Sequence, residues 1–352
     1  MIRTATSMMA ALAIALLPAL GAATQAQTYT FTELSGVEKS FSLGWGISQR
    51  GAVVGYSGVD GGSNWRATLW FRGKVAALGP TDATSRAIAV NKHGDAVGES
   101  TPIGATEWRA TLWRGGITTD LGTLGGTSSH AYGINNAGKI VGEASLADGE
   151  THATLWDEEG IVDLGTLGGP ASTAQAINNA GKIVGSAMTT EGRIHATRWQ
   201  RGHVTDLGTL GGFYSTATAV NELGQIVGYA QDARGRYHAA LWLDDTAIDL
   251  GSLAGDHGYA WGINDAGTIV GHSYLTRKPK PSESRAVMWV DRTIIDMNTL
   301  LDDATRAAGW VLLDARAIND AGQVTGTAKN TLEGKTRAYL LTPPEAGGAG
   351  RP

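Results

Sequence analysis

The sequence contains no cysteine, no basic stripe and, after its first residues, no apolar segment long enough to cross a membrane. Without cysteine no disulfide can form, so packing and strand pairing must hold the fold together. The formal net charge is −5 and Lys and Arg are not clustered, which excludes the electrostatic footprint of a nucleic-acid-binding protein. A membrane-spanning helix needs about 20 apolar residues, so none is expected in the mature chain.

Common catalytic and cofactor motifs are also missing. The sequence has no G-x-S-x-G elbow, Walker loop, H-E-x-x-H or EF-hand spacing. Its Gly-rich DLGTLGG segments are not phosphate cradles, because no helix is predicted after them. Beyond the N-terminal segment no window has the apolar period of a helix, so the predicted fold is all-β. We therefore expect no cofactor and no metal.

The N-terminal segment, MIRTATSMMAALAIALLPALGAATQAQ, has the features of a secretory signal. Arg3 supplies the positive charge, residues 8–17 the apolar run, and positions 22–26 the small residues of a cleavage site. We predict that residues 1–26 are a cleaved signal peptide and that the mature protein is secreted or periplasmic. A buried N-terminal helix is the alternative. The polar tail, 343–352, is expected to be disordered.

What the sequence does contain is a repeat of about 43 residues. INNAGKIVG occurs at 134–142 and again at 177–185, and looser copies occur elsewhere. A fixed period of this length indicates a repeat architecture. Glycine, with 50 of 352 residues, fits the many tight turns of such a fold. The residue that marks each copy, Asn in six copies and Ser in the first, is found at positions 48, 91, 135, 178, 221, 264 and 319.

Each period contains four stretches of strand length separated by Gly, Asn and Asp. In one copy these are HAYGIN at 130–135, KIVGEA at 139–144, HATLW at 152–156 and IVDLGTL at 161–167. Four strands in about 43 residues is the content of a propeller blade, with the small-residue stretch innermost. The sequence predicts a seven-bladed β-propeller of four-stranded antiparallel blades over residues 27–342. An open β-solenoid is the rival fold, but it would need atypical end repeats.

Two recurring features are predicted to be structural. The turn NNAG needs Gly at its fourth place, where a positive φ carries no steric cost, and all seven copies have it. A Trp recurs in the third strand and is expected to fill the wedge between neighbouring blades. These tryptophans are Trp70, Trp113, Trp156, Trp199, Trp242 and Trp289.

The two ends of the repeat region complement each other. YTFTEL at 29–34 matches a fourth strand, whereas RAYLLTP at 337–343 matches a third strand, so the seventh unit lacks its outer strand. We predict that 29–34 pairs antiparallel with 337–342 and places Glu33 opposite Arg337. This pairing would close the ring and hide both sheet edges.

Repeated His and Asp residues invite a metal or catalytic interpretation. His152, His195 and His238 occupy one place in the third strand, but neighbouring blades hold such places roughly 10 Å apart, too far for one ion. An Asp follows 11 residues after each, nearly opposite in the hairpin, so a cross-strand pair is predicted instead. We expect no metal site.

Taken together, the motifs N-x-x-G-x-I-V-G, H-A-x-x-W and D-L-G-x-L-G-G resemble the HAF repeat family of bacterial extracellular proteins. The resemblance covers nearly the whole mature chain. It departs from the family at the naming His-Ala-Phe, which reads HAT at 152–154 and 195–197, and Arg replaces His in four copies. The resemblance implies export and repetition, and no reaction, substrate or cofactor.

Function is expected where the copies disagree, since variable positions on a rigid scaffold carry binding. The residue three places before the marker differs in every copy except the first and sixth, which both have Trp. The loops after the second strand differ too, and insertions at 276–284 and within 300–313 should lie on one face. The candidate binding residues are Trp45, Trp65, Trp108, Tyr132, Tyr237, Trp261, Asp302, Asp303, Trp310 and Arg316.

Three functions are compatible with these patterns. The working prediction is a monomeric exported binding module with no catalytic residue, whose partner is an extracellular ligand such as a glycan or protein. A polysaccharide-directed hydrolase or lyase would instead need carboxylates about 5 to 10 Å apart at the channel mouth, with Asp256, His257, Asp302 and Asp303 as candidates. A structural cell-surface protein is the third possibility.

Overall fold

The computed structural model describes residues 28–59, 61, 64–80, 83–101, 104–254, 257–276 and 283–344. The predicted signal peptide, most of the predicted tail, Asp256 and the middle of the 276–284 insertion lie outside the described residues. Within the described ranges, no helix is long and apolar enough to span a bilayer.

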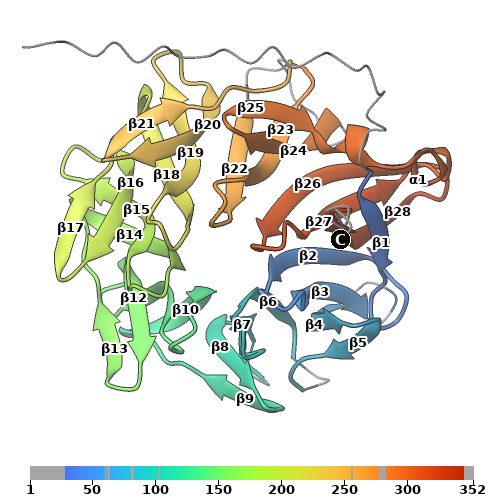
Figure 1. Cartoon of the computed structure of the whole chain (residues 1–352). Coiled ribbons are helices and arrows are strands. Elements are labelled where there is room, and N and C mark those ends of the chain that lie inside the picture. The colour runs from blue at the N-terminus through green and yellow to red at the C-terminus, as the bar shows by residue number, and fades with distance from the viewer. Residues whose placement is uncertain are drawn as a thin grey trace, which may run out of the picture.

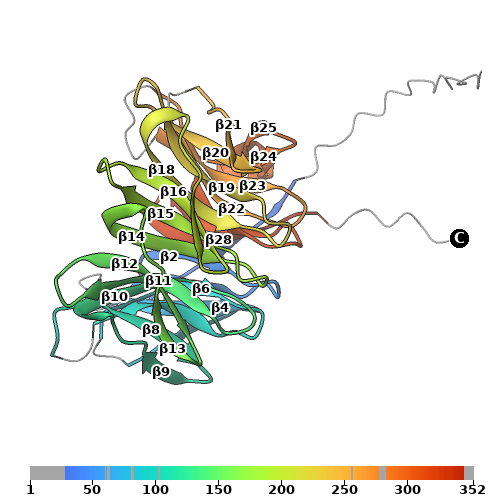
Figure 2. The same ribbon diagram turned by 90° about the vertical axis from the view of Figure 1, so that its left-hand side faces the viewer.

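The fold is all-β, and its described strands form seven antiparallel units of four strands around one centre (Figure 1). We number the units 1 to 7 by the chain order of their innermost strands. Seen from the side, successive units stand next to one another (Figure 2). Single parallel bridges, Thr151 to Ala171 and Ile194 to Tyr214, join units 3, 4 and 5 into one twelve-stranded sheet.

The strands fall into four classes by their distance from the centre (Figure 1). The inner strands are β2 (Ser42–Ile47), β6 (Ser85–Val90), β10 (Gly125–Ile134), β14 (Gly168–Ile177), β18 (Gly211–Val220), β22 (Gly258–Ile263) and β26 (Trp310–Ile318). The second strands are β3 (Val53–Val59), β7 (Ala96–Ser100), β11 (Ile140–Leu146), β15 (Ile183–Thr189), β19 (Ile226–Asp232), β23 (Ile269–Tyr274) and β27 (Val324–Asn330). The third strands are β4 (Asn64–Phe71), β8 (Arg109–Arg114), β12 (Thr151–Asp157), β16 (Ile194–Gln200), β20 (Tyr237–Leu243), β24 (Ser284–Val290) and β28 (Lys335–Thr342). The outer strands are β5 (Lys74–Ala77), β9 (Ile117–Asp120), β13 (Gly160–Asp163), β17 (His203–Asp206), β21 (Thr246–Asp249), β25 (Thr293–Asp296) and β1 (Thr30–Leu34).

The predicted strand order within a unit is confirmed, with one correction to a boundary. In unit 3 the order is β10, β11, β12 and β13, which matches the order predicted from the sequence. The IVDLGTL stretch, however, is not one strand. β13 ends at Asp163, and the next inner strand, β14, already begins at Gly168. Gly165 and Gly168 have φ of +73° and +97°, so the chain turns there between two units.

A second glycine in each unit shapes the inner strand. Gly142, the last residue of IVG, faces Ala131 across the sheet, and the register shifts at the next pair, leaving Tyr132 bulged. A Cβ on Gly142 would collide with the carbonyl oxygen of His130, so only glycine permits this close approach. The same shift occurs in all seven units, three places before the marker residue.

The marker Asn has a role beyond its turn. In unit 4 the Oδ1 atom of Asn178 accepts a hydrogen bond from Lys182 N at 2.9 Å, which holds its own hairpin. Its Nδ2 atom donates to the carbonyl oxygen of Asn221 in the next unit at 3.0 Å. The same bond to the next unit is made by Asn91, Asn135, Asn221, Asn264 and Asn319, the last reaching Ser48 in unit 1.

The residue after the marker forms a parallel set of bonds. Its backbone N–H donates to the side chain one unit ahead, for example from Asp265 to Asp320 at 2.9 Å and from Asp320 to Gln49 at 3.0 Å. At one junction between described units, the residues present can form neither of these two hydrogen bonds. Between units 1 and 2, Ser48 has no amide to donate, and Lys92 has no acceptor.

We predict that completing this junction stabilises the protein. The double variant Ser48→Asn, Lys92→Asn supplies the missing donor and acceptor, and two added hydrogen bonds should contribute about 1–2 kcal/mol. Chemical denaturation measures the change. The reciprocal variant Asn135→Ser, which removes the amide from a complete junction, should lower the free energy of unfolding by a similar amount. An unchanged or lower stability of the double variant would contradict the assigned role.

The units pack through the predicted tryptophans, all of which are at most 4% exposed. Trp156 of unit 3, for example, belongs to the same core cluster as Val97 and Ala110 of unit 2. The first described strand, β1, pairs antiparallel with the last, β28, from Thr30 opposite Thr342 to Leu34 opposite Ala338. The predicted pairing of 29–34 with 337–342 is therefore observed.

Two details of the predicted cross-strand pairs need correction. Glu33 lies opposite Tyr339 rather than Arg337, and its Oε1 atom still reaches Arg337 Nε diagonally at 3.0 Å. Asp163 likewise lies opposite Thr154 and accepts from His152 on the diagonal. For Asp163 the reason is the short hairpin turn between β12 and β13, which sets the register two residues away from the one expected. The pair of β1 and β28 has the same diagonal offset without a connecting turn.

Candidate functional site

Seven side chains, one from each inner strand, converge on a pocket at the centre of the ring. Each is the bulged residue three places before a marker. The pocket has a volume of about 320 Å³. The sequence singled out these places by their variation, and the structure brings all seven together. We call this site the central pocket, and the side chains that define it are Trp45, Ile88, Tyr132, Gln175, Thr218, Trp261 and Arg316.

A layer of β-branched side chains forms the floor of the central pocket. It consists of the residue directly before the marker in every unit except unit 5, where Val220 does not line the pocket. Below it lies a smaller pocket of about 140 Å³, lined by marker residues and their neighbours, so the layer divides the axial space in two. The floor residues of the central pocket are Ile47, Val90, Ile134, Ile177, Ile263 and Ile318.

Arg316 is held between two indole rings on one wall of the central pocket. Its guanidinium carbon lies 4.6 Å from the ring centroid of Trp261 and 5.0 Å from that of Trp45. Its Nη2 atom lies 3.4 Å from a carboxylate oxygen of Asp314 on the same strand. Cation–π stacking and the ion pair fix the guanidinium in one orientation.

His272 supports this wall from the second strand β23. The Nε1–H of Trp261 donates to His272 Nδ1 at 2.8 Å, which requires a neutral imidazole with its proton on Nε2. Burial, followed by the positive charge of Arg316, lowers the pKa of His272 to about 3. The neutral form is therefore maintained over the whole physiological pH range.

The opposite wall carries buried carboxylates that link neighbouring units. Glu99 is 3% exposed and pairs with Arg86 of its own unit and His130 of the next. Burial alone would lower the pKa of His130, but the hydrogen bond and charge of Glu99, with Glu143, raise it above its ordinary value. Glu143 accepts hydrogen bonds from the hydroxyls of Tyr132, at 3.0 Å, and Thr173.

A cluster of half-buried aromatic rings in units 5 and 6 contacts Trp261, which lines the central pocket. Tyr259 stacks on His272 with centroids 4.8 Å apart and meets Tyr229 edge-on at 4.9 Å. Tyr237, a predicted binding residue, stacks on Tyr259 at 5.8 Å. The central pocket is therefore flanked by aromatic rings in units 5 and 6 and by carboxylates in units 2 and 3.

The other predicted binding residues divide into two groups. The ring centroids of Trp65 and Tyr56 are 6.4 Å apart, and Tyr56 in turn lies beside Trp45 of the central pocket. The Trp108 ring lies 4.8 Å from the Arg86 guanidinium. Neither Trp65 nor Trp108 lines the central pocket itself. The remaining three, Asp302, Asp303 and Trp310, do not line the central pocket, and their binding role stays a prediction.

Asp302 and Asp303 belong to the short helix α1 (Asp303–Ala307), which follows the 3-10 turn Met297–Leu300. Asp302 caps α1 by accepting from the backbone N–H of Thr305 at 2.8 Å, and Asp303 pairs with Arg306 within the helix. Trp310 packs on Phe31 of β1, with centroids 5.1 Å apart, and is part of the core. Of the hydrolase candidates, His257, Asp302 and Asp303 do not line the central pocket, and Asp256 lies outside the described residues.

Sequence reasoning missed Arg86, Glu99, Glu143, His272 and Asp314. A signal was present, because Glu99, Glu143 and His272 occupy the place directly after the glycine of IVG, where the copies also differ. The repeated histidines behave as predicted. His152, His195 and His238 each pair with the aspartate eleven residues further along the chain.

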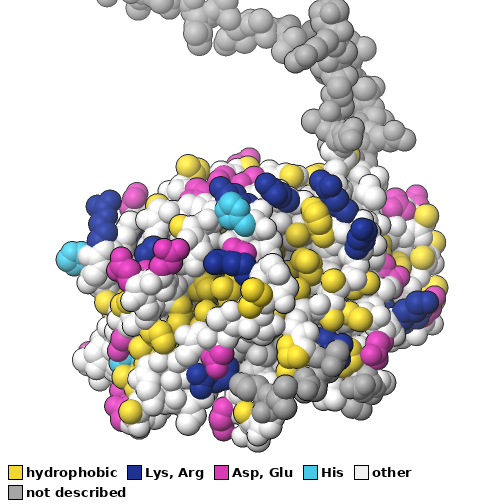
Figure 3. Space-filling view, turned by 90° about the horizontal axis from the view of Figure 1, so that it is seen from below, with side chains coloured by type: hydrophobic (Ala, Val, Ile, Leu, Met, Phe, Trp, Pro, Cys, Tyr) yellow, Lys and Arg dark blue, Asp and Glu magenta, His cyan; other side chains and the backbone are white. Residues whose placement is uncertain are grey.

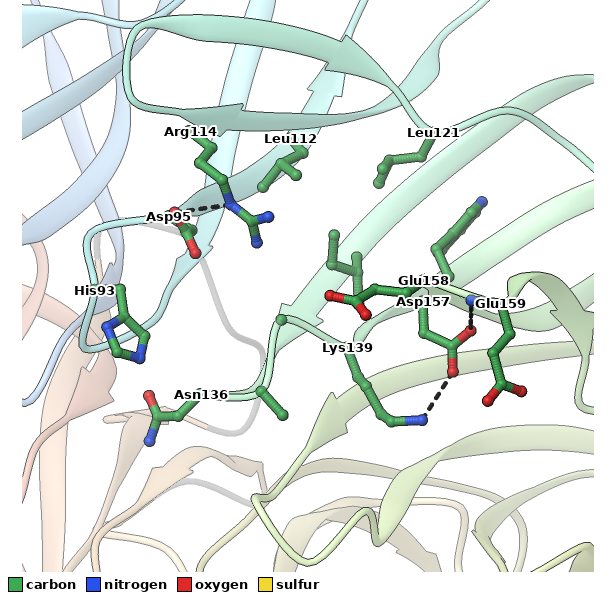
Figure 4. Close-up of a pocket in the computed structure, with 14 residues that line it drawn as sticks. His93, Asp95, Leu112, Arg114, Leu121, Asn136, Lys139, Asp157, Glu158 and Glu159 are labelled. Atoms are coloured by element: carbon green, nitrogen blue, oxygen red, sulfur yellow. Dashed lines mark hydrogen bonds and ion pairs between the residues drawn. The ribbon is translucent and has the colours of Figure 1, made fainter.

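A larger pocket, about 550 Å³, lies between units 2 and 3 near the marker turns (Figure 4). Its charged residues bind each other, Arg114 with Asp95 at 3.1 Å and Lys139 with Asp157 at 2.8 Å (Figure 4). Similar grooves occur between units 4 and 5 and between units 7 and 1. The pocket between units 2 and 3 is therefore one of several grooves that form where neighbouring units diverge, rather than a specialised site. Acidic and basic side chains are also intermingled on the edge of the ring seen in Figure 3.

Comparison with known proteins supports the fold. No family model and no curated protein matches the sequence. The structure is similar to a puromycin hydrolase, with a TM-score of 0.53 and 12% identity over 85% of this chain and 53% of that chain. TolB from Acinetobacter baumannii has a TM-score of 0.43 and 12% identity, over 83% of this chain and 63% of its own. The chain thus spans about half to two thirds of the length of these proteins. At 12% identity, the likeness to the puromycin hydrolase shows an all-β fold of the propeller type and nothing of function.

Proposed function

We propose that the mature chain is a closed seven-bladed β-propeller that binds a small ligand in the central pocket. One observation carries the proposal: the units share their glycines and interface tryptophans, yet nearly every unit places a different side chain in the pocket. A scaffold built only for structure has no need of this variety. The pairing of β1 with β28 and the bond from Asn319 to Ser48 support the closed ring.

A thermal-shift screen of small molecules tests the binding role. A ligand at a hundredfold excess over its dissociation constant stabilises the folded state by about 2.7 kcal/mol. We expect a compound that raises the midpoint of the wild type to lose its effect on Trp45→Ala, which removes one side of the Arg316 stack. The control is Phe213→Ala, an exposed aromatic residue that does not line the pocket. Equal protection of wild type and both variants would place binding elsewhere.

We further propose that the chain is exported and is related to the HAF repeat proteins. The proposal is supported by the charged start and apolar run of residues 1–26 and by the shared repeat motifs. The mature N-terminus is expected near Thr24 or Gln27 in the exported fraction. Mass spectrometry that finds an intact Met1 there would contradict export.

A further inference from the structure

We propose that the ligand of the central pocket is an uncharged saccharide that enters by one end of its chain. This inference rests on the proposed binding function and adds the class of ligand. Three features of the pocket and its walls carry it: the charge balance, the unused hydrogen-bonding groups and the shape.

The charged groups around the central pocket already neutralise one another. Arg86 and His130 pair with Glu99, and Arg316 pairs with Asp314. The charge of Glu143 also favours the protonated form of His130, since it helps to raise the pKa of that imidazole. An anionic ligand would have to compete with Asp314 for Arg316. A cationic ligand would approach the Arg316 charge that also helps to keep His272 neutral. A ligand without formal charge meets neither penalty.

The pocket offers neutral polar groups next to aromatic faces. Within the described part of the chain, the amide of Gln175 lines the pocket and has no hydrogen-bond partner, so one donor group and one acceptor are free. Tyr132 and the indole side chains of Trp45 and Trp261 line the same space. The Tyr132 hydroxyl already donates to Glu143 and the Trp261 N–H to His272, so Gln175 supplies the free amide. Sugar rings present hydroxyls at their edges and C–H groups on their faces, and they match this combination of amide and aromatic groups.

The shape of the pocket favours a chain end. Its volume of about 320 Å³ lies at the low end of the roughly 300–1,000 Å³ typical of small-molecule sites. The Ile and Val floor closes it below. A polymer cannot thread through the axis, so one or two terminal sugar units would occupy the pocket while the rest of the chain lies against the Tyr237 and Tyr259 side of the entrance.

Calorimetric titration of the full mature chain with defined sugars tests the inference. The probes are maltose, cellobiose and lactose as neutral sugars, glucuronic acid and glucosamine as charged analogues, and a neutral aromatic amide without hydroxyls. We expect at least one neutral sugar to bind and the charged analogues to bind at least about ten-fold more weakly. Two derivatives of the bound sugar, one blocked at its non-reducing end and one blocked at its reducing end, are then compared. We expect one of them, the one blocked at the end that enters the pocket, to lose binding.

The variant Gln175→Leu removes the free amide and should weaken binding of that sugar about ten-fold, the effect of one lost hydrogen bond. Gln200→Leu is the matched control, since Gln200 ends the third strand β16 away from the pocket and should bind as the wild type. If a charged probe or the aromatic amide binds in a Gln175-dependent way and no sugar does, the saccharide class is wrong and the binding pocket stands. If no probe binds in a Gln175-dependent way, the saccharide inference is also overturned. The Trp45→Ala screen then decides separately whether the pocket binds anything.

Discussion

The protein is expected to lose stability as the pH falls below about 6.5, the ordinary pKa of histidine, with His272 as a principal cause. The pKa of His272 in the folded state is lowered to about 3. Between these values the unfolded chain binds a proton that the folded chain does not, so stability falls by about 1.4 kcal/mol for each pH unit. The total from this group is about 4–5 kcal/mol on reaching pH 3.

The variant His272→Gln isolates this contribution. Glutamine keeps an acceptor for the indole N–H of Trp261 but does not titrate, so the variant should lose much less stability than the wild type between these pH values. Urea unfolding at a series of pH values measures the difference. His203→Gln, a change at an exposed histidine on β17, should keep the wild-type profile. Parallel pH profiles for wild type and His272→Gln would show that His272 is protonated freely in the folded state.

Removal of β1 is expected to have a comparably large effect. Deleting residues 28–34 takes away Phe31, which packs on Trp310 and Tyr339, and leaves β28 as an open edge. Arg337, which is 7% exposed, would lose the carboxylate of Glu33. We expect a loss of about 3–5 kcal/mol in unfolding free energy, together with concentration-dependent aggregation.

The single variant Glu33→Gln provides the comparison for this deletion. Glu33 is 36% exposed, and Arg337 also donates to the carbonyl oxygens of Lys39 and Thr336, so the expected cost is below about 1 kcal/mol. Denaturant unfolding and light scattering measure both variants. A deleted chain that remains monomeric and as stable as the wild type would show that β1 contributes nothing to the fold.

Local chemistry explains which parts of the fold were predictable. The glycine of NNAG was expected to supply a positive φ, and φ at these seven positions lies between 73° and 91°. The bond from each marker Asn to the next unit was not foreseen, because the hairpin alone already accounts for Asn at a turn. Its partner lies at least 43 residues away in every case, and no local pattern specifies such a contact.

The site was predictable in part for a similar reason. Variation among the seven repeats identified the bulged residues such as Tyr132 and Arg316. Positions that are the same in every repeat maintain the fold, whereas positions that vary are free to line a binding surface. Asp302 and Asp303 were singled out as charges in an insertion, and their binding role stays a prediction. The order Asp-Asp-Ala-Thr is equally that of a helix cap, and the structure uses it in this way.

The linked carboxylates have a consequence for how such a chain evolves. Glu99 of unit 2 binds His130 of unit 3, Glu143 of unit 3 binds Thr173 of unit 4, and Tyr229 of unit 5 meets Tyr259 of unit 6. Each contact is split across a boundary between repeats, so neither repeat carries it alone. Exchanging or duplicating one repeat would leave Glu99 beside a side chain selected for another neighbour, so this buried carboxylate would keep Arg86 but lose His130. The order of the repeats is thus inherited as a whole, and substitutions at these boundaries should occur in pairs.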